Sequence, residues 1–214
     1  MFPPVSIVWP CPLSVEEYVN GDRLVSFPRP DCPACSSAMS KWSGYRRFVR
    51  WPGGEERIFV PRLRCRACKV THALLPSFVL VKRLDVTETI VTTLAEVAVG
   101  PAGVRRVAKR IGLPYTTVRG WARRFFARAG RIATMFAALA VELGGEVITA
   151  PPDAGRAAVG AIGAAFRGAV DLPGWQTVGL SGFCSSVVGG RLIATNMNSL
   201  YLFVGKRRFM PPVP

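Results

Sequence analysis

The sequence contains little histidine, few acidic residues and no long apolar run, and each shortage excludes a class of protein. His72 is the one histidine, and 13 Asp and Glu stand against 28 Lys and Arg. No stretch reaches the ~18 uninterrupted apolar residues of a membrane-spanning helix, and the first residues lack the basic lead and apolar core of a secretory signal. We therefore expect a cytoplasmic protein, nucleoid-associated if bacterial, with no membrane partner and with reduced thiols.

Residues that could form a catalytic site are scarce as well. Transposases of the DDE type hold two metal ions with three carboxylates. The acids that follow Arg131 do not sit in a clear strand-end context: Glu142, Glu146, Asp153 and Asp171. Tyrosine recombinases combine histidine with arginine and tyrosine, but the one histidine lies beside a cysteine pair. A phosphate-binding Gly-Lys loop is not found, so we expect no enzymatic activity.

The positive charge comes from two stretches of the chain. The formal net charge is +15; residues 41–83 carry 11 Lys and Arg against two acids, and residues 101–131 carry nine against none. A field of this sign attracts polyanions, either nucleic acid or an anionic membrane surface. These two stretches produce all of the excess charge.

Four of the six cysteines form two Cys-x-x-Cys pairs, CPAC at 32–35 and CRAC at 65–68. Two such turns that face each other place four thiolates in a tetrahedron, as in closed structural zinc sites. Nearby cations would offset the thiolate charge: Arg62, Arg64, Arg66 and Lys69. We predict a structural Zn²⁺ site with four ligands: Cys32, Cys35, Cys65 and Cys68. The alternatives are a thioredoxin-type redox pair, for which a βαβ pattern is missing, and unrelated buried cysteines.

The residues between the two pairs predict a β-hairpin. YRRFVRW at 45–51 and RIFVPRLR at 57–64 flank PGGEE at 52–56, which we interpret as a five-residue loop. Candidates for phosphate contacts lie on the first strand: Arg46, Arg47 and Arg50. With four thiolates present, we expect His72 in a loop or beside the ligands rather than as a ligand.

Residues 85–143 change to helical periodicity. A first helix precedes the break at Gly100-Pro101, a second fits 102–111, and a third starts near Tyr115 and runs toward Leu143. The segment VRRVAKRIGLPYTTVRGWAR fits the helix-turn-helix template, because a small residue stands where the helices cross and glycine stands in the turn. These two positions are Ala108 and Gly112.

The polar face of this helix pair supplies the candidate DNA contacts. Thr116, Arg119 and Arg123 recur at i, i+3 and i+7, the N-terminal part of a recognition helix enters the major groove, and arginine pairs with guanine there. On the recognition helix we predict contacts from Tyr115, Thr116, Thr117, Arg119 and Arg123. On the preceding helix we predict phosphate contacts from Arg105, Arg106, Lys109 and Arg110. The alternative is a solvated basic face, although such a face usually mixes signs.

These elements predict an α+β protein with four parts. We expect an N-terminal segment with a short helix at 1–30, a small zinc ribbon at 31–83, a three-helix helix-turn-helix domain at 84–143 and a Gly/Ala-rich segment at 144–214. The ribbon is a β-hairpin with two Cys-x-x-Cys knuckles. The C-terminal segment is expected to be irregular, with a short helix around 154–169 and a role that stays open.

The order of these parts resembles a known family. The segments WPCPLSVEEYV, CPAC, WSGYRRFVR, CRACKVTHALLPSFVLVKRLD and GGRLIATN, with the helix-turn-helix, resemble an actinobacterial family of unknown function that is described as transposase-like. The N-terminal half is similar to the zinc-ribbon and helix-turn-helix front end of several insertion-sequence transposases. The resemblance covers most of the chain. It implies zinc and DNA binding and supplies no established activity.

We therefore expect sequence-selective binding of double-stranded DNA, by a regulator or by a recognition protein derived from a mobile element. A homodimer is left open. The first alternative is a transposase or recombinase, degenerate or dependent on a partner, and the second is an RNA-binding or protein-interaction module. Metal-dependent strand cleavage would favour the first, and competition between duplex DNA and RNA would test the second.

Overall fold

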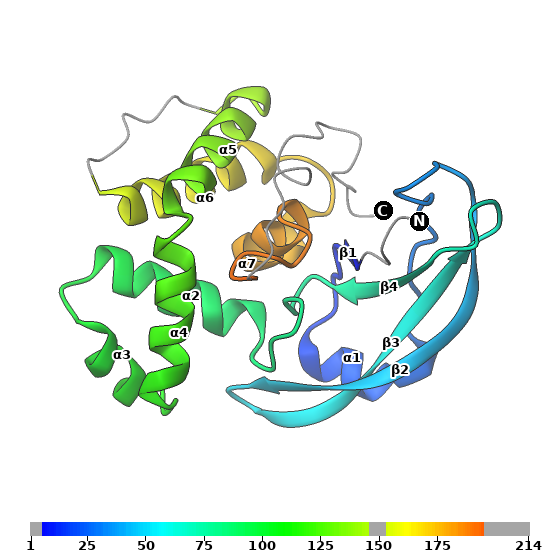
Figure 1. Ribbon diagram of the computed structural model, residues 1–214, viewed down its shortest axis with the longest axis horizontal. Coiled ribbons are helices and arrows are strands. Elements are labelled where there is room, and N and C mark those ends of the chain that lie inside the picture. Colours follow the sequence, from blue (N-terminus) through cyan, green and yellow to red (C-terminus); the bar gives the residue numbers. More distant parts are fainter. Residues whose placement is uncertain (1–5, 146–152, 195–214) are drawn as a thin grey trace.

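The computed structural model describes residues 6–145 and 153–194, which form an α+β fold (Figure 1). A sheet and a short helix come first along the chain, and a group of packed helices follows. Each part has its own hydrophobic core, and the two cores lie on either side of residues 77–86. No helix in the described ranges is both long and apolar enough to cross a membrane.

The sheet has four strands in the order β1-β4-β3-β2. Strands β2 (Met39–Trp51) and β3 (Gly54–Cys65) form a long antiparallel hairpin, and β4 (Thr71–Pro76) pairs antiparallel with β3. Strand β1 (Ile7–Trp9) adds to β4 in parallel. The sheet is therefore mixed, and the start of the chain completes it.

The prediction of a five-residue loop at the end of the hairpin is wrong. Trp51 pairs with Gly54, so the turn consists of Pro52 and Gly53 alone, and pairing continues through Glu55 and Glu56. These acids lie at the exposed tip, where backbone hydrogen bonds rather than burial define the strand. Their polarity therefore concealed the strand in the sequence. The extra length between the cysteine pairs is strand, not loop.

Helix α1 (Val15–Gly21) begins with a capping box formed by Ser14 and Glu17. Ser14 Oγ accepts from Glu17 N at 3.1 Å, and Glu17 Oε2 accepts from Ser14 N at 2.7 Å. The helix ends beside a single turn of 3-10 helix, η1 (Asp22–Leu24). Tyr18 packs into the core of the sheet and donates its hydroxyl to Phe59 O at 2.9 Å, which fixes α1 on β3.

Three helices follow the sheet at the expected places: α2 (Thr87–Val99), α3 (Val104–Arg110) and α4 (Tyr115–Phe126). The prediction of one long third helix toward Leu143 is wrong, because the chain turns at Ala127 and Arg128 and continues as α5 (Ala129–Glu142). Helix α4 buries its apolar side against α2 and α3, whereas α5 packs along α6. A straight helix could not reach both sets of partners.

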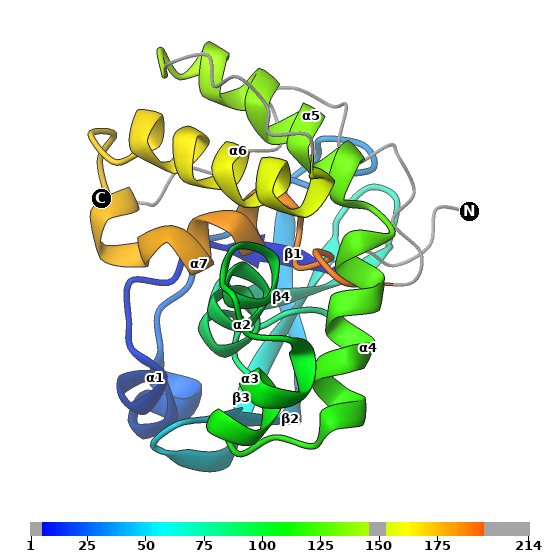
Figure 2. The ribbon, with the colours of Figure 1, turned by 90° about the vertical axis from the view of Figure 1, so that its left-hand side faces the viewer.

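The C-terminal part is not irregular, and the helical part is not a simple three-helix domain. Helix α6 (Ala154–Ala169) matches its expected position, and α7 (Trp175–Val187) was not expected. Figure 2 shows α5, α6 and α7 stacked over α2. Gly179 inside α7 has a φ of 67°, so the helical period is interrupted there. The sequence also carries weak strand signals at 191–195 and 200–204; residues 191–194 are not a strand, and the remaining positions lie outside the described residues.

Candidate metal centre and nucleic-acid interface

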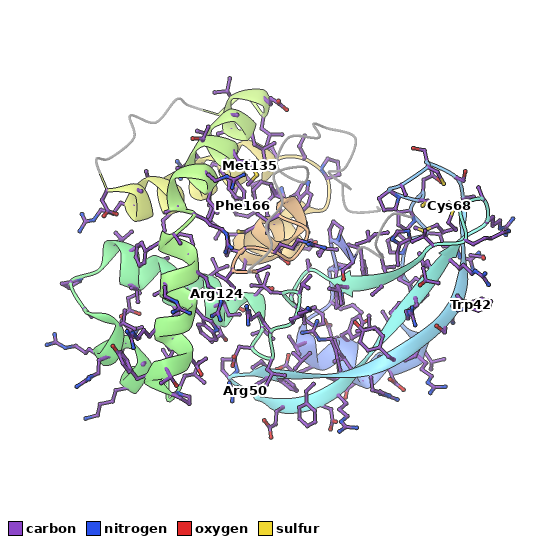
Figure 3. The ribbon with its side chains drawn as sticks, in the orientation of Figure 1. Trp42, Arg50, Cys68, Arg124, Met135 and Phe166 are labelled. Carbon is purple, nitrogen blue, oxygen red and sulfur yellow. The ribbon has the colours of Figure 1, made fainter. Side chains whose placement is uncertain are left out.

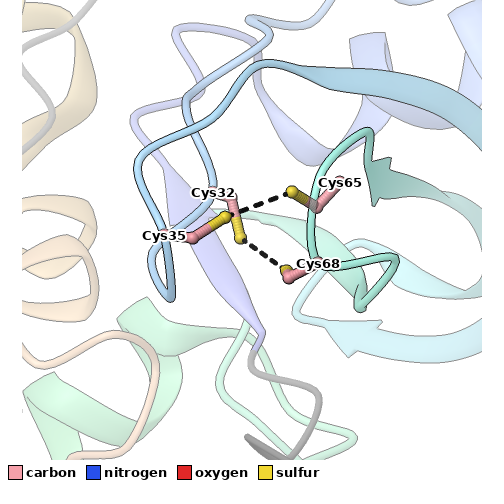
Figure 4. Close-up of side chains that lie close together, drawn as sticks. All are labelled: Cys32, Cys35, Cys65 and Cys68. Atoms are coloured by element: carbon pink, nitrogen blue, oxygen red, sulfur yellow. Dashed lines mark hydrogen bonds between the residues drawn. The ribbon is translucent and has the colours of Figure 1, made fainter.

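Two knuckles of the same geometry carry the four cysteines. One precedes β2 and holds Cys32 and Cys35; the other follows β3 and holds Cys65 and Cys68 (Figure 4). In each knuckle the amide of the first cysteine donates to the carbonyl five residues later, at 2.9 Å. In each, the residue after the second cysteine has a positive φ, 56° at Ser36 and 61° at Lys69. The long hairpin brings these two equivalent turns face to face.

The four sulfur atoms form a compact cluster. The Cys32 and Cys68 Sγ atoms are 3.7 Å apart, those of Cys35 and Cys65 are 3.4 Å apart, and all four lie within 4.8 Å of one another. A tetrahedron with zinc–sulfur bonds of ~2.3 Å has edges of about 3.8 Å. All six cysteines of the chain are free thiols. The cluster could therefore bind a metal ion such as Zn²⁺.

The cluster is half-buried, and its thiols differ in acidity. Cys32 and Cys65 are buried, whereas Cys35 and Cys68 are exposed. Burial raises the pKa of Cys32 to about 12, and the backbone amide of Ser37 is the main cause that lowers the pKa of Cys35 to about 6. The exposed Cys35 of the first knuckle thus offers a thiolate, and a divalent cation would replace the proton on the buried Cys32 of the same knuckle.

His72 lies beside the cluster and not within it. It sits on β4 opposite Leu63, is 1% exposed, and places Nε2 3.5 Å from Cys32 Sγ. An imidazole N–H aimed at a thiolate orients that ligand and stabilises its charge. The expectation of a histidine beside the ligands therefore holds, although the residue is on a strand.

The three hairpin arginines that we predicted to contact phosphate have partners within the protein. Arg46 pairs with Asp22 at 2.7 Å, and Arg50 pairs with Asp85 at 2.7 Å. Arg47 donates to the carbonyls of Leu80, at 3.2 Å, and of Arg83. Arg46 contacts η1, whereas Arg47 and Arg50 contact residues 80–85, which precede α2. Their charge therefore holds the hairpin to the rest of the chain.

Arg47→Met is expected to destabilise the protein by about 1–3 kcal/mol, because it removes the donor to Arg83 O and one of the two donors to Leu80 O in the partly buried junction. Urea unfolding measures this change. Arg57→Met is the matched control, since Arg57 is exposed on the same hairpin and lies over the Phe48 ring. Equal stability of the two variants would contradict a structural role for Arg47.

Helices α3 and α4 pack against each other and are joined by a short turn, residues 111–114. The turn contains Gly112, whose φ of 69° favours glycine, and Leu113 N donates to Ala108 O at 3.1 Å. Ala108 is buried where the helices meet, as expected. The apolar side of α4 enters the helical core: Val118, Trp121, Ala122 and Phe125.

Most of the predicted DNA contacts lie on the open side of this pair. The exposed residues are Tyr115, Thr116, Arg119 and Arg123 on α4, and Arg105, Arg106, Lys109 and Arg110 on α3. Thr117 is half-buried. The Arg105 guanidinium lies 5.2 Å from the Tyr115 ring centroid, and Arg110 forms an ion pair with Glu96. Arg110 is therefore partly neutralised, unlike its neighbours.

The hairpin also carries exposed aromatic side chains that the sequence analysis did not single out: Trp42, Tyr45 and Phe48. Their signal is visible in the segment WSGYRRF, where rings alternate with cations at short spacing. In a strand, such residues would normally divide between a buried and an exposed face. Here the twisted hairpin leaves all three rings partly open.

Comparison with known proteins finds a match for the cysteine cluster, the hairpin and the first helices that follow it. Residues 32–108 match the model of a family described as Domain of unknown function (DUF6431). No curated protein and no solved structure matches the chain. The match begins at the first cysteine of the cluster and ends in α3, so it includes both knuckles, the hairpin and α2. Residues 32–108 are therefore similar to this domain of unknown function, and their four-cysteine cluster suggests a zinc-binding module.

Proposed function

We propose that the protein binds double-stranded DNA sequence-selectively through α4, with a zinc-clamped hairpin as its support. The observation that carries this proposal is the division of α4 into two faces. Thr116, Arg119 and Arg123 are exposed on one face, while Val118 and Trp121 are buried on the other. A recognition helix needs this division, because one side packs in the protein while the other enters the major groove.

The charge around α4 supports the same proposal. Between residues 97 and 141 the sequence has no Asp or Glu, and within the described residues Arg110 is the one cation of α3 and α4 with an acidic partner, Glu96. Arg106 and Lys109 are exposed on α3, at positions suited to phosphates beside the groove. Phosphate contacts would fix the register of α4, and its arginines would then read base edges.

The hairpin supports the helix-turn-helix through its tip. Arg50 N donates to Leu84 O at 2.8 Å, and Val86 N donates to Arg50 O at 3.0 Å. The Arg50–Asp85 ion pair reinforces the same junction. Helix α2 begins directly after Val86, at Thr87. The metal-bound knuckles would therefore fix a hairpin whose other end holds the first helix of the DNA-binding part.

A regulator and a recognition protein from a mobile element would both use this arrangement. The resemblance of the N-terminal half to the front end of insertion-sequence transposases supports the second role. Neither role requires strand cleavage by this chain, and catalysis is not part of the proposal.

The affinity for duplex DNA is expected to fall steeply with salt, because each neutralised phosphate releases a counterion. With three cations of α3 on phosphates (Arg105, Arg106 and Lys109), the slope of log K against log salt would be about −3. Fluorescence anisotropy with labelled duplex DNA at increasing salt measures it. An affinity that does not change with salt would contradict the proposal.

A further inference from the structure

The knuckle end of the hairpin carries a second surface of defined chemistry. We name it the outer ring face: Trp42, Tyr45, Arg62 and Arg64. Trp42 is 57% exposed and sits at the irregularity between Lys41 and Ser43, where the register shifts. Tyr45 is 40% exposed. On the neighbouring strand β3, Arg62 lies opposite Ser43 in the register and Arg64 lies opposite Ser40. Two rings and two guanidinium groups thus share one region of the twisted hairpin.

The cations of this face are held in place but not neutralised. The Arg64 guanidinium lies 4.5 Å from the Trp42 ring centroid, and its Nε donates to Lys69 O at 3.4 Å. Arg62 donates to Thr71 Oγ1 at 2.9 Å. These acceptors are neutral, and within the described ranges neither arginine has a carboxylate partner. The face therefore keeps its charge and presents it in a fixed geometry.

The surroundings add more positive charge and no negative charge from acids. The sequence has no Asp or Glu from residue 32 to 54 or from 57 to 84. Four thiolates with Zn²⁺ carry a net charge of about −2. Five cations on β2, β3 and the second knuckle outweigh it: Lys41, Arg62, Arg64, Arg66 and Lys69. A polyanion is the partner that this field attracts.

We propose that the outer ring face binds unpaired bases of single-stranded nucleic acid. A base would stack on Trp42, with Arg64 against the ring, a second would contact Tyr45, and Arg62 would bind the phosphate between them. A duplex cannot use exposed rings in this way, because its bases already stack on one another. Single strands leave each base free to stack on an aromatic side chain.

The position of the face makes it independent of α4. Trp42 and Cys68 lie at one end of the longest axis of the molecule, and α3 and α4 lie toward the other (Figure 3). A duplex on α4 would therefore not cover the outer ring face. The inference goes beyond the proposed function, and one can be correct without the other.

Binding of labelled oligothymidylate and oligouridylate to the zinc-loaded full chain tests the proposal. Trp42→Ala is expected to weaken binding of the oligonucleotide about tenfold, since stacking on a ring contributes this much per base. Trp42→Phe keeps a ring and should retain most of the affinity. Leu24→Ala is the matched control, because Leu24 is an exposed apolar residue outside the face, at 92% exposure.

A second measurement uses intrinsic fluorescence. Of the five tryptophans, Trp9, Trp121 and Trp175 are at most 4% exposed, Trp51 is half-buried at the opposite end of the hairpin, and Trp42 is 57% exposed. Stacking of unlabelled oligothymidylate should therefore quench the fluorescence, and the quenching should be lost in Trp42→Phe although binding remains. Preference between oligodeoxyuridylate and oligouridylate, which differ in the sugar alone, identifies the sugar that the face accepts.

The outcomes separate this proposal from DNA recognition by α4. Trp42→Ala is expected to leave duplex binding unchanged, and Arg119→Ala is expected to leave oligothymidylate binding unchanged. The proposal is overturned if the wild-type protein binds neither oligonucleotide, or if Trp42→Ala binds them as tightly as wild type. It is also overturned if Trp42→Ala weakens duplex and single strands equally, because the face would then contact duplex phosphates or support the fold.

Discussion

Cys65→Ser is expected to abolish stoichiometric zinc binding and to lower the melting temperature by roughly 8–16 °C. Structural zinc contributes about 10–16 kcal/mol in small domains, and loss of even a third, about 4 kcal/mol, shifts the melting temperature of a chain of this size by that amount. Cys65 ends β3, is buried, and lies 3.4 Å from Cys35 Sγ. Its loss opens the cluster at the point where the two knuckles meet.

Metal content by mass spectrometry and melting by circular dichroism check this result. Cys184→Ala is the control, because Cys184 is also buried but lies in α7, outside the cluster. The Cys184→Ala variant should have a lower melting temperature than the wild type and still contain stoichiometric metal. Full zinc content in Cys65→Ser would contradict the four-thiolate site, as would wild-type protein that is folded without any metal.

Arg119→Ala is expected to relax the sequence preference of duplex binding and to cost about 1–3 kcal/mol on the preferred site. Arg119 is exposed on α4, one turn from Thr116, on the face opposite the buried Trp121. An arginine that pairs with guanine contributes only where that base is present. The loss should therefore be large on the preferred sequence and small on unrelated DNA.

Arg110→Ala is the matched control for this prediction. Arg110 belongs to the same helix pair but forms an ion pair with Glu96, so its removal should weaken duplex binding less than removal of Arg119, and on every sequence alike. Competition binding between specific and unrelated duplexes measures both effects. If Arg119→Ala weakens all duplexes equally, Arg119 contacts only phosphates and sequence reading by α4 is contradicted.

The parts of the fold that depend on local chemistry could be predicted from the sequence. Two Cys-x-x-Cys turns require only that a hairpin brings them together, and the structure does so. Ser14 and Glu17 specify the start of α1 through their own hydrogen bonds. Gly112 marks the turn between α3 and α4, because its positive φ suits glycine alone.

The parts that depend on distant partners could not be predicted. The break between α4 and α5 occurs in a continuous helical pattern, because α5 must turn to reach α6. Helix α7 has weak amphipathicity, since Trp175 and Phe183 pack among several helices rather than along one face. Burial from more than one side removes the period that sequence analysis detects.

The number of basic residues in a stretch also does not show which of them have partners elsewhere in the fold. Arg46, Arg47 and Arg50 are as basic as Arg119 and Arg123, and the sequence gives no distinction between them. The structure does, because Asp22, Asp85 and the carbonyls of Leu80 and Arg83 accept their hydrogen bonds. A cationic stretch therefore predicts a polyanionic partner only for those side chains that are neither paired with a carboxylate nor enclosed in a junction of the fold.

Selection of bound sequences from random duplex DNA by the zinc-loaded protein tests the central claim most directly. The account predicts enrichment of a short motif, with a preferred guanine whose enrichment disappears when the selection is repeated with Arg119→Ala. Recovery of an unenriched pool, or of the same motif from the wild type and the variant, would contradict recognition of DNA by α4.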